Sequence, residues 1–219
     1  ETLKKLNKKE LIPTGYLYLD FLKENIDIKK DNNHILIAPS WNYNLKNSIN
    51  ENFIKLIEIL LDKKQKVIFR PHPEHYKRSK KILQYIKNKF LNENFEFDNN
   101  SENINSMEKA KCLITDNSGI AIEFIITLKR PVLYLDEFDK IHNTEFNNYS
   151  ALKTIDYKIK KNFGYLFKEK EFNQIDLIIN NSIEDFKNKV PMLDSFINEN
   201  FANYGKTKDY FAKISKKIF

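Results

Sequence analysis

The chain has 219 residues, of which 41% are hydrophobic and 31% are charged, a composition typical of one large globular domain with a polar surface. No apolar stretch approaches the roughly 20 residues of a membrane-spanning helix, and a single cysteine excludes a disulfide framework or a cysteine metal site. The net charge of +7 indicates either a solvated lysine-rich surface or an attraction to polyanions; without a zinc finger or an RNP-like strand, nucleic acid is not expected as a partner.

Short apolar runs alternate with helical patterns between residues 34 and 136. We expect strands at residues 34–39, 66–69, 95–98, 111–116 and 131–136. We expect helices at residues 47–64, 74–91, 101–110 and 118–129, the third with Ser101 as its N-cap. This alternation predicts an α/β fold with Rossmann-like winding, in which a parallel sheet is covered by helices on both faces.

The two ends of the chain are less regular. Residues 1–30 are interpreted as a linker or entry segment, with a turn at Thr14–Gly15 before a helix, and residues 31–219 as one Rossmann-like domain. Past residue 137 the alternation is expected to stop, in a partly irregular segment followed by helices from 173 to 190 and from about 192. In the last helix Tyr210, Phe211 and Ile214 recur at helical spacing among lysines; a core-facing stripe is expected, with a contact to a membrane interface as the alternative.

The stretch RPHP, residues 70–73, follows a predicted strand. Proline biases the residue before it toward an extended backbone, so Arg70 and His72 are both held where the strand ends. His72 can act as a general acid or base, or as a donor to a phosphate oxygen. Arg70 either pairs with phosphate or has a structural role. His75, at the start of the next helix, is expected on the surface.

Residues 115–119, TDNSG, turn a predicted strand directly into a helix. The first turn of a helix has unpaired N–H groups and the positive end of the dipole, which together attract an anion. Small side chains at Ser118 and Gly119 let a phosphate approach; the alternative is ordinary capping by Asp116, Asn117 or Ser118. The carboxyl ends of parallel strands share one edge, so RPHP, TDNSG and the polar run PSWNYN (39–44) after the first strand should line one crevice. We therefore prefer phosphate binding.

Glu123 lies one turn into a helix whose neighbouring side chains from 120 to 126 are almost all apolar. A carboxylate there is either on the solvent face or buried with a partner, and a buried one beside a nucleotide can bind ribose hydroxyls. The histidines are dispersed, so we expect no metal site and no tightly bound cofactor.

These motifs resemble the CDP-glycerol glycerophosphotransferase family, the teichoic-acid and capsule polymerases of bacteria. The second half of that family typically carries a strand ending in K/R-x-H-P, then a [ST]-D-x-S-[SG] turn opening a helix, then an RP-apolar strand. Residues 70–73 and 115–136 are similar to these. Residues 12–22, IPTGYLYLDFL, are similar to the family's TGYPRxDxL linker, with Leu17 and Tyr18 in place of the usual Pro-Arg.

The resemblance implies a GT-B fold, in which this chain is the C-terminal, nucleotide-binding half and faces an N-terminal domain that carries much of the acceptor site. His72 would then lie near the transferred or leaving phosphate. The turn that binds the CDP phosphates would consist of Thr115, Asp116, Asn117, Ser118 and Gly119. Gly119 stands where the family has a second serine, so one hydroxyl contact to phosphate is missing.

The implied function is transfer from a CDP-activated donor, CDP-glycerol or similar, to a polysaccharide or polyol-phosphate acceptor of a cell-surface polymer. We expect a cytoplasmic enzyme, or one held peripherally at the inner face of the membrane. Two alternatives stay open. The UDP-N-acetylglucosamine 2-epimerase family and other nucleotide-sugar glycosyltransferases share the GT-B fold, although the epimerase pattern TDSGG-x-x-E-E is matched less well. A non-catalytic module that binds polyanions through surface lysines is the other.

Overall fold

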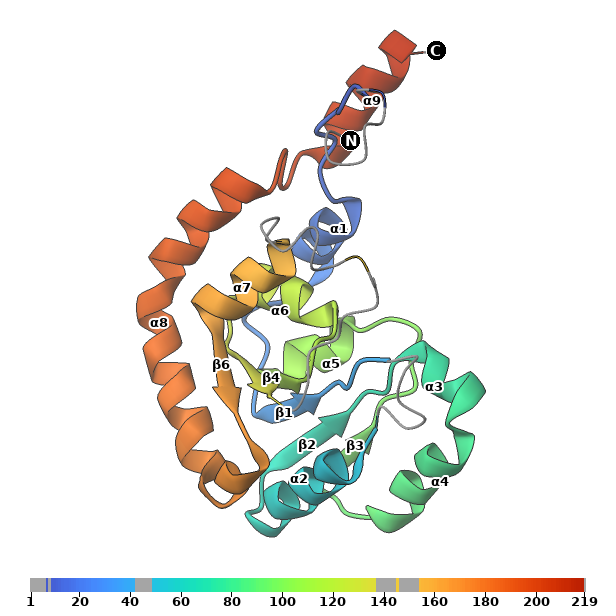
Figure 1. Cartoon of the computed structure of the whole chain (residues 1–219), viewed down its shortest axis with the longest axis vertical. Coiled ribbons are helices and arrows are strands. Elements are labelled where there is room, and N and C mark those ends of the chain that lie inside the picture. Colours follow the sequence, from blue (N-terminus) through green and yellow to red (C-terminus); the bar gives the residue numbers. More distant parts are fainter. Residues whose placement is uncertain (1–6, 8, 42–48, 137–144, 146–153, 219) are drawn as a thin grey trace.

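The computed structural model describes residues 7, 9–41, 49–136, 145 and 154–218, and at their centre lies a six-stranded sheet (Figure 1). The strands are β1 (His34–Ile37), β2 (Lys66–Phe69), β3 (Phe95–Phe97), β4 (Ala110–Thr115), β5 (Val132–Leu135) and β6 (Gly164–Phe167). Their order across the sheet is β3-β2-β1-β4-β5-β6, and every neighbouring pair is parallel. The chain therefore starts in the middle of the sheet, builds one half and returns to build the other, which confirms the predicted α/β fold with Rossmann-like winding.

Helices surround this sheet (Figure 1). They are α1 (Leu17–Asn25), α2 (Glu51–Asp62), α3 (Pro73–Arg78), α4 (Lys80–Lys89), α5 (Ile104–Lys109), α6 (Ile120–Leu128), α7 (Ile155–Phe163), the 3-10 helix η2 (Glu169–Gln174), α8 (Ile175–Asn200) and α9 (Thr207–Ile218). The helix expected over 74–91 is interrupted at Ser79, whose backbone angles of −126° and 31° are not helical. The prediction of Ser101 as an N-cap is wrong, because α5 begins only after Asn103.

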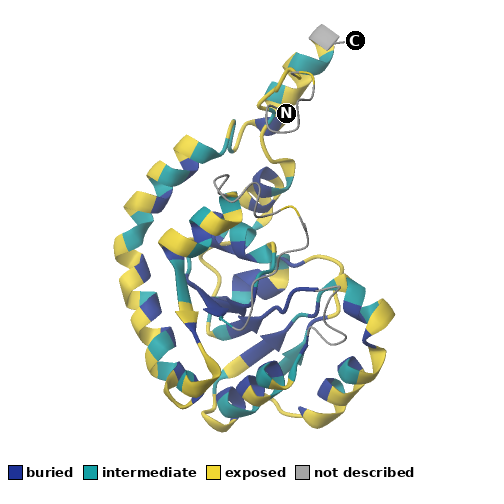
Figure 2. Ribbon diagram, viewed as in Figure 1, coloured by how far each residue is buried: buried dark blue, intermediate teal, exposed yellow. Residues whose placement is uncertain are grey.

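The inner strands are buried on both faces, as parallel strands between two helical layers must be. Along β1, Ile35 and Ile37 pack into one layer, while Leu36 between them packs into the other. The first layer is closed by α2, α4 and the start of α8, and the second by α1, α6, α7 and the later part of α8. Figure 2 shows the resulting pattern of buried strands and of helices that are exposed only on their outer side.

The helix α7 and the strand β6 were not expected from the sequence. The expectation that alternation stops past residue 137 is wrong for residues 155–167, because β6 pairs in parallel with β5 along its whole length. The strand escaped prediction because it is short and lies at the edge of the sheet, where Leu166 is 57% exposed and Phe167 alone is buried. Its apolar residues follow Phe163 of α7 without a break, and so short a run cannot be told from the end of a helix by periodicity. Most of the irregular segment expected before it lies outside the described residues.

The C-terminal part is helical, as predicted, but its two helices differ in packing. α8 continues through Pro191, so the expected break near residue 191 is absent, and it curves around the β6 side of the sheet (Figure 1). α9 projects away from the domain beside the N-terminal segment. Phe211 of α9 is 52% exposed, so the expected core-facing stripe is not formed at that residue, while Tyr210 and Ile214 are half-buried.

Candidate functional site

Three strand ends meet at one edge of the sheet. Ile37 of β1 lies between Phe69 of β2 and Ile114 of β4, so the residues that follow these strands lie side by side. The stretches 70–73 and 115–119 therefore flank the end of β1, where the strand order reverses. Both lie at the same edge, as predicted, and this is where doubly wound sheets bind their ligands.

A buried carboxylate joins the ends of β1 and β4. Asp116 is 3% exposed and accepts hydrogen bonds from the backbone N–H of Ser40 (2.8 Å) and from its hydroxyl (2.6 Å). The fully buried hydroxyl of Thr115 donates to the carbonyl of Ala38 at 2.7 Å. Thr115 and Asp116 therefore fix the base of the turn that residues 117–119 complete.

His72 begins α3 and caps it. Its Nδ1 accepts a hydrogen bond from the backbone N–H of Glu74 at 3.2 Å, and the proline at the first helical position keeps the start of α3 in place. An Nδ1 atom that accepts is unprotonated, so the neutral ring carries its proton on Nε2. His72 therefore caps α3, as a histidine without a catalytic role would. The capping bond uses Nδ1 and leaves the proton of the neutral ring on Nε2.

His75 lies in α3, three residues after His72, and the prediction that it lies on the surface is wrong. Its side chain is fully buried, because the third residue of α3 faces inward. Nε2 lies 3.2 Å from the carbonyl of Ser40 and Nδ1 lies 3.3 Å from the hydroxyl of Ser79, while the ring of Trp41 meets it edge-on at 5.1 Å. Burial lowers the pKa of His75 to about 4, so the ring is neutral at physiological pH.

The turn before α6 ends without a side-chain cap. Gly119 is the N-cap residue, and without a side chain it gives α6 no capping bond. Among the residues that the structure describes, no heavy atom would lie within 4 Å of a Cβ at Gly119, so the space beside it is open to them. Asn117 accepts a hydrogen bond at 3.1 Å from Lys160 of α7, which brings a cation to the turn. We call Ser40, His72, His75, Asp116 and residues 117–119 the switch-point cluster.

Arg70 holds a loop. Its guanidinium pairs with Asp98 at 2.5 Å and donates to the carbonyls of Glu102 (3.1 Å) and Ser101 (3.2 Å). The side chains of Arg70 and Asp98 are only 14% and 2% exposed. Of the two roles considered from the sequence, the structure shows the structural one in these contacts.

Glu123 is half-buried and has partners from two other elements. The hydroxyl of Tyr16 donates to Oε1 at 3.3 Å, and Nδ2 of Asn103 donates to Oε2 at 3.2 Å. The hydroxyl of Tyr18 donates in turn to Oδ1 of Asn103 at 2.8 Å. Burial raises the pKa of Glu123, an effect that the bonds from Tyr16 and Asn103 and the charge of Arg70 oppose. We call these five residues the Glu123 cluster.

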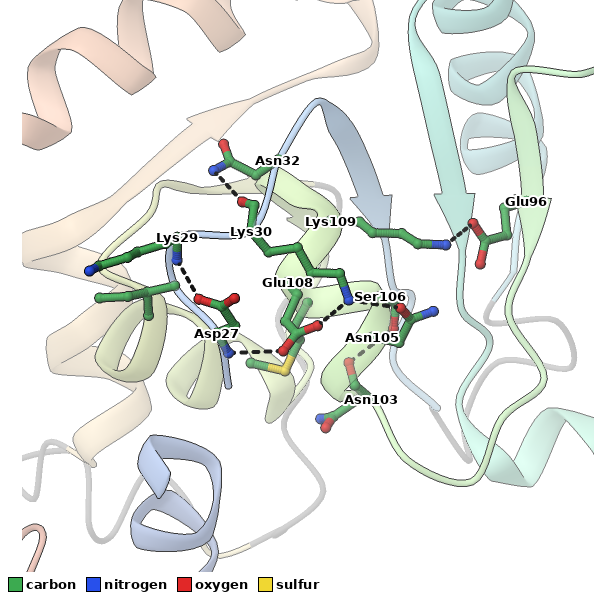
Figure 3. Close-up of polar contacts among 12 residues, drawn as sticks. Asp27, Lys29, Lys30, Asn32, Glu96, Asn103, Asn105, Ser106, Glu108 and Lys109 are labelled. Carbon is green, nitrogen blue, oxygen red and sulfur yellow. Dashed lines mark hydrogen bonds and ion pairs between the residues drawn. The ribbon is translucent and has the colours of Figure 1, made fainter. Parts of the chain in front are cut away.

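The helix α5, which starts beside Asn103, is attached to the N-terminal segment at its far end as well. Figure 3 shows Glu108 accepting from the backbone N–H of Asp27 (2.9 Å) and from Nζ of Lys30 (2.6 Å). It also shows the hydroxyl of Ser106, which donates to the carbonyl of Asn103 at 3.0 Å. The segment 16–30, expected as a linker, is thus bonded to both ends of α5.

Several of these residues were missed from the sequence. Ser40 belongs to the polar run 39–44, which was expected at this edge, but it was given no role of its own. Lys160 lies in a lysine-rich helix where nothing distinguishes it, and Tyr16 and Tyr18 lie in a segment that was read as a linker.

Two cavities of about 410 and 440 Å³ share Phe90, Leu91 and Asn92, between α4 and β3, away from the crevice. Among the described residues, no helix is long and apolar enough to cross a membrane, and no three acidic, histidine or cysteine side chains could together hold a metal ion.

Comparison with known proteins gives a family and a set of similar folds. Residues 7–179 match the family model described as CDP-Glycerol:Poly(glycerophosphate) glycerophosphotransferase. The chain is similar to the UDP-GlcNAc 2-epimerase of Methanocaldococcus jannaschii, solved with UDP-GlcNAc and UDP, at 20% identity and a TM-score of 0.55 over 98% of this chain and 57% of that one. It is also similar to the wall teichoic acid polymerase TagF, at 19% identity and a TM-score of 0.46 over 90% of this chain and 46% of that one.

A third similar structure is that of Staphylococcus aureus MnaA with UDP, at 18% identity and a TM-score of 0.48 over 92% of this chain and 52% of that one. The chain thus spans about half the length of these proteins. No protein of curated function matches the sequence significantly. At 20% identity, the similarity to the M. jannaschii epimerase shows the fold alone. That fold agrees with one half of a two-domain GT-B arrangement.

Proposed function

The chain belongs to the CDP-glycerol:poly(glycerophosphate) glycerophosphotransferase family, and on that premise we propose that it is the donor-binding half of a transferase that uses a CDP-activated donor. The donor is CDP-glycerol or a close analogue. The acceptor is a growing bacterial cell-surface polymer, a teichoic acid or a capsule. A second domain faces this one across the crevice and supplies much of the acceptor site.

The observation that carries the proposal is the meeting of His72 and the turn 115–119 at the reversal of strand order. A helix that begins after a glycine offers backbone N–H groups and the positive end of its dipole to a phosphate. The hydroxyl of Ser118 adds a donor, and Lys160, bonded to Asn117, adds positive charge. Thr115 and Asp116 contribute by holding the turn in place rather than by contact.

His72 is the catalytic residue of the proposal. The acceptor hydroxyl attacks the β-phosphorus of the donor, the P–O bond to CMP breaks, and negative charge develops on the departing phosphate. The hydroxyl proton leaves to solvent or to a base on the facing domain. Nε2–H of His72 donates to the leaving oxygen, which general acid assistance or hydrogen bonding stabilises.

Arg70 and Glu123 complete the nucleotide site. Arg70 shapes it by fixing the loop 98–102, and its charge lies close enough to act on Glu123. Glu123 accepts hydrogen bonds from the ribose hydroxyls, because a half-buried carboxylate one turn from the phosphate-binding helix start is placed for that part of a nucleotide.

The test is the turnover of the full-length enzyme with CDP-glycerol after His72→Ala and His72→Asn. General acid–base assistance is worth about 10²–10⁴-fold, so both variants should lose at least about 100-fold in turnover. His72→Ala also removes a helix cap, at a cost of about 0.5–2 kcal/mol in stability, whereas asparagine is itself a good cap. Near-normal turnover of His72→Asn would show that RPHP ends a strand and begins a helix without serving catalysis.

A nucleotide panel separates this function from its alternatives. CDP and CMP should raise the melting temperature of the chain more than UDP and UMP, because a base pocket distinguishes the two bases. A preference for UDP would favour a nucleotide-sugar enzyme of the epimerase kind. An equal response to any polyanion, lost steeply with added salt, would favour a lysine surface.

We place the enzyme in the cytoplasm, peripherally bound to the inner face of the membrane through α9. The exposed Phe211 and the exposed lysines Lys208, Lys213 and Lys216 support this placement, because an apolar side chain among cations suits an anionic interface. Co-sedimentation with anionic liposomes should fall when residues 205–219 are removed. Equal sedimentation of both forms would exclude α9 as the contact.

A further inference from the structure

A chain of three side chains links α1 to the carboxylate of α6. The Tyr18 hydroxyl donates to Oδ1 of Asn103 at 2.8 Å, and Nδ2 of the same amide donates to Oε2 of Glu123 at 3.2 Å. An asparagine side chain has one accepting end and one donating end. A donor bound to the amide oxygen therefore leaves the NH₂ group to face the partner on the other side.

The Tyr18 hydroxyl fixes the direction of the Asn103 amide. In the opposite orientation Oδ1 would face the Glu123 carboxylate, and two acceptors would oppose one another at hydrogen-bonding distance. With Tyr18 donating to Oδ1, the NH₂ group points at Glu123 and holds one carboxylate oxygen. A carboxylate has about four acceptor positions, so further donors can still bind Glu123 beside Asn103 and Tyr16.

Tyr18 is itself held firmly. Its ring stacks on Phe21 with centroids 5.9 Å apart, and its neighbour Leu19 is fully buried. The next residue, Asp20, is 3% exposed and accepts from the backbone N–H groups of Gly205 and Thr207, each at 2.7 Å. The hydroxyl of Tyr18 is therefore placed by the packing of α1 and not by chance on a mobile surface.

We propose that Tyr18 is a positioning residue of the nucleotide site, which orients the Asn103 amide so that Glu123 is held to accept the hydroxyl groups of a ribose. This inference rests on the proposed function, in which Glu123 contacts the ribose. It adds the entry segment 16–30 to the site. Tyr18 acts through Asn103 and does not touch the nucleotide.

The test compares two ligands that differ only in the ribose. Binding of CMP and of 2′,3′-dideoxy-CMP to the 219-residue chain is measured by calorimetry, with pyrophosphate as a probe of the phosphate contacts alone. Tyr18→Phe keeps the ring and removes the hydroxyl, and should weaken CMP about 3- to 10-fold, the worth of one hydrogen bond. Dideoxy-CMP and pyrophosphate should bind within about twofold of the original chain. Asn103→Asp, which sets two carboxylates against each other, should weaken CMP more than Tyr18→Phe does.

A matched control is Tyr85→Phe, which removes a hydroxyl from a 47% exposed tyrosine of α4 and should change none of the three affinities. If the original chain binds CMP and dideoxy-CMP equally, the ribose role of Glu123 in the proposed function is wrong. If the original chain discriminates between them and Tyr18→Phe discriminates equally well, the positioning role of Tyr18 alone is overturned. Equal weakening of CMP, dideoxy-CMP and pyrophosphate would overturn it too, since the effect would then be on the fold.

Discussion

The switch-point cluster and the Glu123 cluster lie at the same edge of the sheet but are built differently. The first takes its residues from the ends of neighbouring strands, so the register of β1, β2 and β4 already places them. The second depends on side chains from the start of α1, from the loop after β3 and from α6, which are joined by hydrogen bonds across elements far apart in the sequence. Substitutions should therefore separate the two, because in the proposed function the first cluster binds the phosphates and the second binds the ribose.

The largest effect should come from Arg70→Ala, which leaves Asp98 buried without its cation. Removing one partner of a buried pair costs about 3–5 kcal/mol, so the free energy of unfolding measured in urea should fall by that amount. Discrimination between CMP and dideoxy-CMP should be lost with the loop 98–102, while pyrophosphate binding remains. Arg78→Ala is the control. The Arg78 side chain is 59% exposed and pairs with Glu74, so its loss should cost less than about 1 kcal/mol. Loss of pyrophosphate binding in Arg70→Ala would show that the two clusters are not separable.

A smaller loss is expected for Asp116→Ala, on the other side of the comparison. The change leaves the buried N–H and hydroxyl of Ser40 without their acceptor, which should cost about 2–4 kcal/mol in unfolding free energy. Pyrophosphate binding should weaken in this variant, because the turn 117–119 loses its support. Asp185→Ala, at a 53% exposed side chain of α8, should be nearly neutral. An Asp116→Ala protein with unchanged stability would contradict the assigned role.

Glu123→Gln should sharpen the contrast between stability and binding. Burial raises the pKa of Glu123, so the folded state binds a proton more readily than the unfolded state, and the ionised form costs stability as pH rises through the folded pKa. The variant should melt at a higher temperature at pH 7.5, with the gain shrinking toward pH 4, and should bind CMP more weakly. The charged and titratable groups facing this carboxylate are Tyr16, Tyr18 and Arg70. A lower melting temperature at pH 7.5 would mean that the bonds from Tyr16 and Asn103 outweigh the burial.

The smallest effects should come from single hydroxyl groups at the start of α6. Ser118→Ala removes one neutral hydrogen bond to a phosphate and should cost about 0.5–1.5 kcal/mol of CDP binding. Gly119→Ser adds a hydroxyl at a helical φ of −60° with open space around it, so it should tighten CDP by a similar amount at no cost in stability. Calorimetric titration of both variants provides the comparison. Weaker binding by Gly119→Ser would show that the phosphate needs the space that the missing side chain leaves.

The fold could be predicted wherever apolar runs end in polar turns. β2 was predicted to the residue and β1, β4 and β5 within two residues, because buried parallel strands are continuously apolar. The meeting of RPHP with TDNSG followed from the rule that parallel strands end at one edge. β6 was not found in this way although residues 163–167 are apolar, because this short run directly continues a helix and periodicity cannot separate the two.

The side-chain partners could not be predicted. Nothing local shows that His75 faces inward, because the short α3 lacks a full turn of apolar residues to indicate its buried side. The contact of Tyr18 with Asn103 spans 85 positions of sequence and depends on how α1 packs. Sequence patterns thus located the switch-point cluster, and tertiary packing determined the Glu123 cluster.

The helix α8 has a consequence for how the domain unfolds. Its first turns, with Ile175 and Ile179, pack into one layer, whereas Phe186, Leu193 and Ile197 pack into the other. One continuous helix is therefore shared by both hydrophobic layers, and neither layer can come apart while the other keeps all its contacts. The domain should unfold in a single cooperative step, with far-UV circular dichroism and the fluorescence of Trp41 changing together in urea.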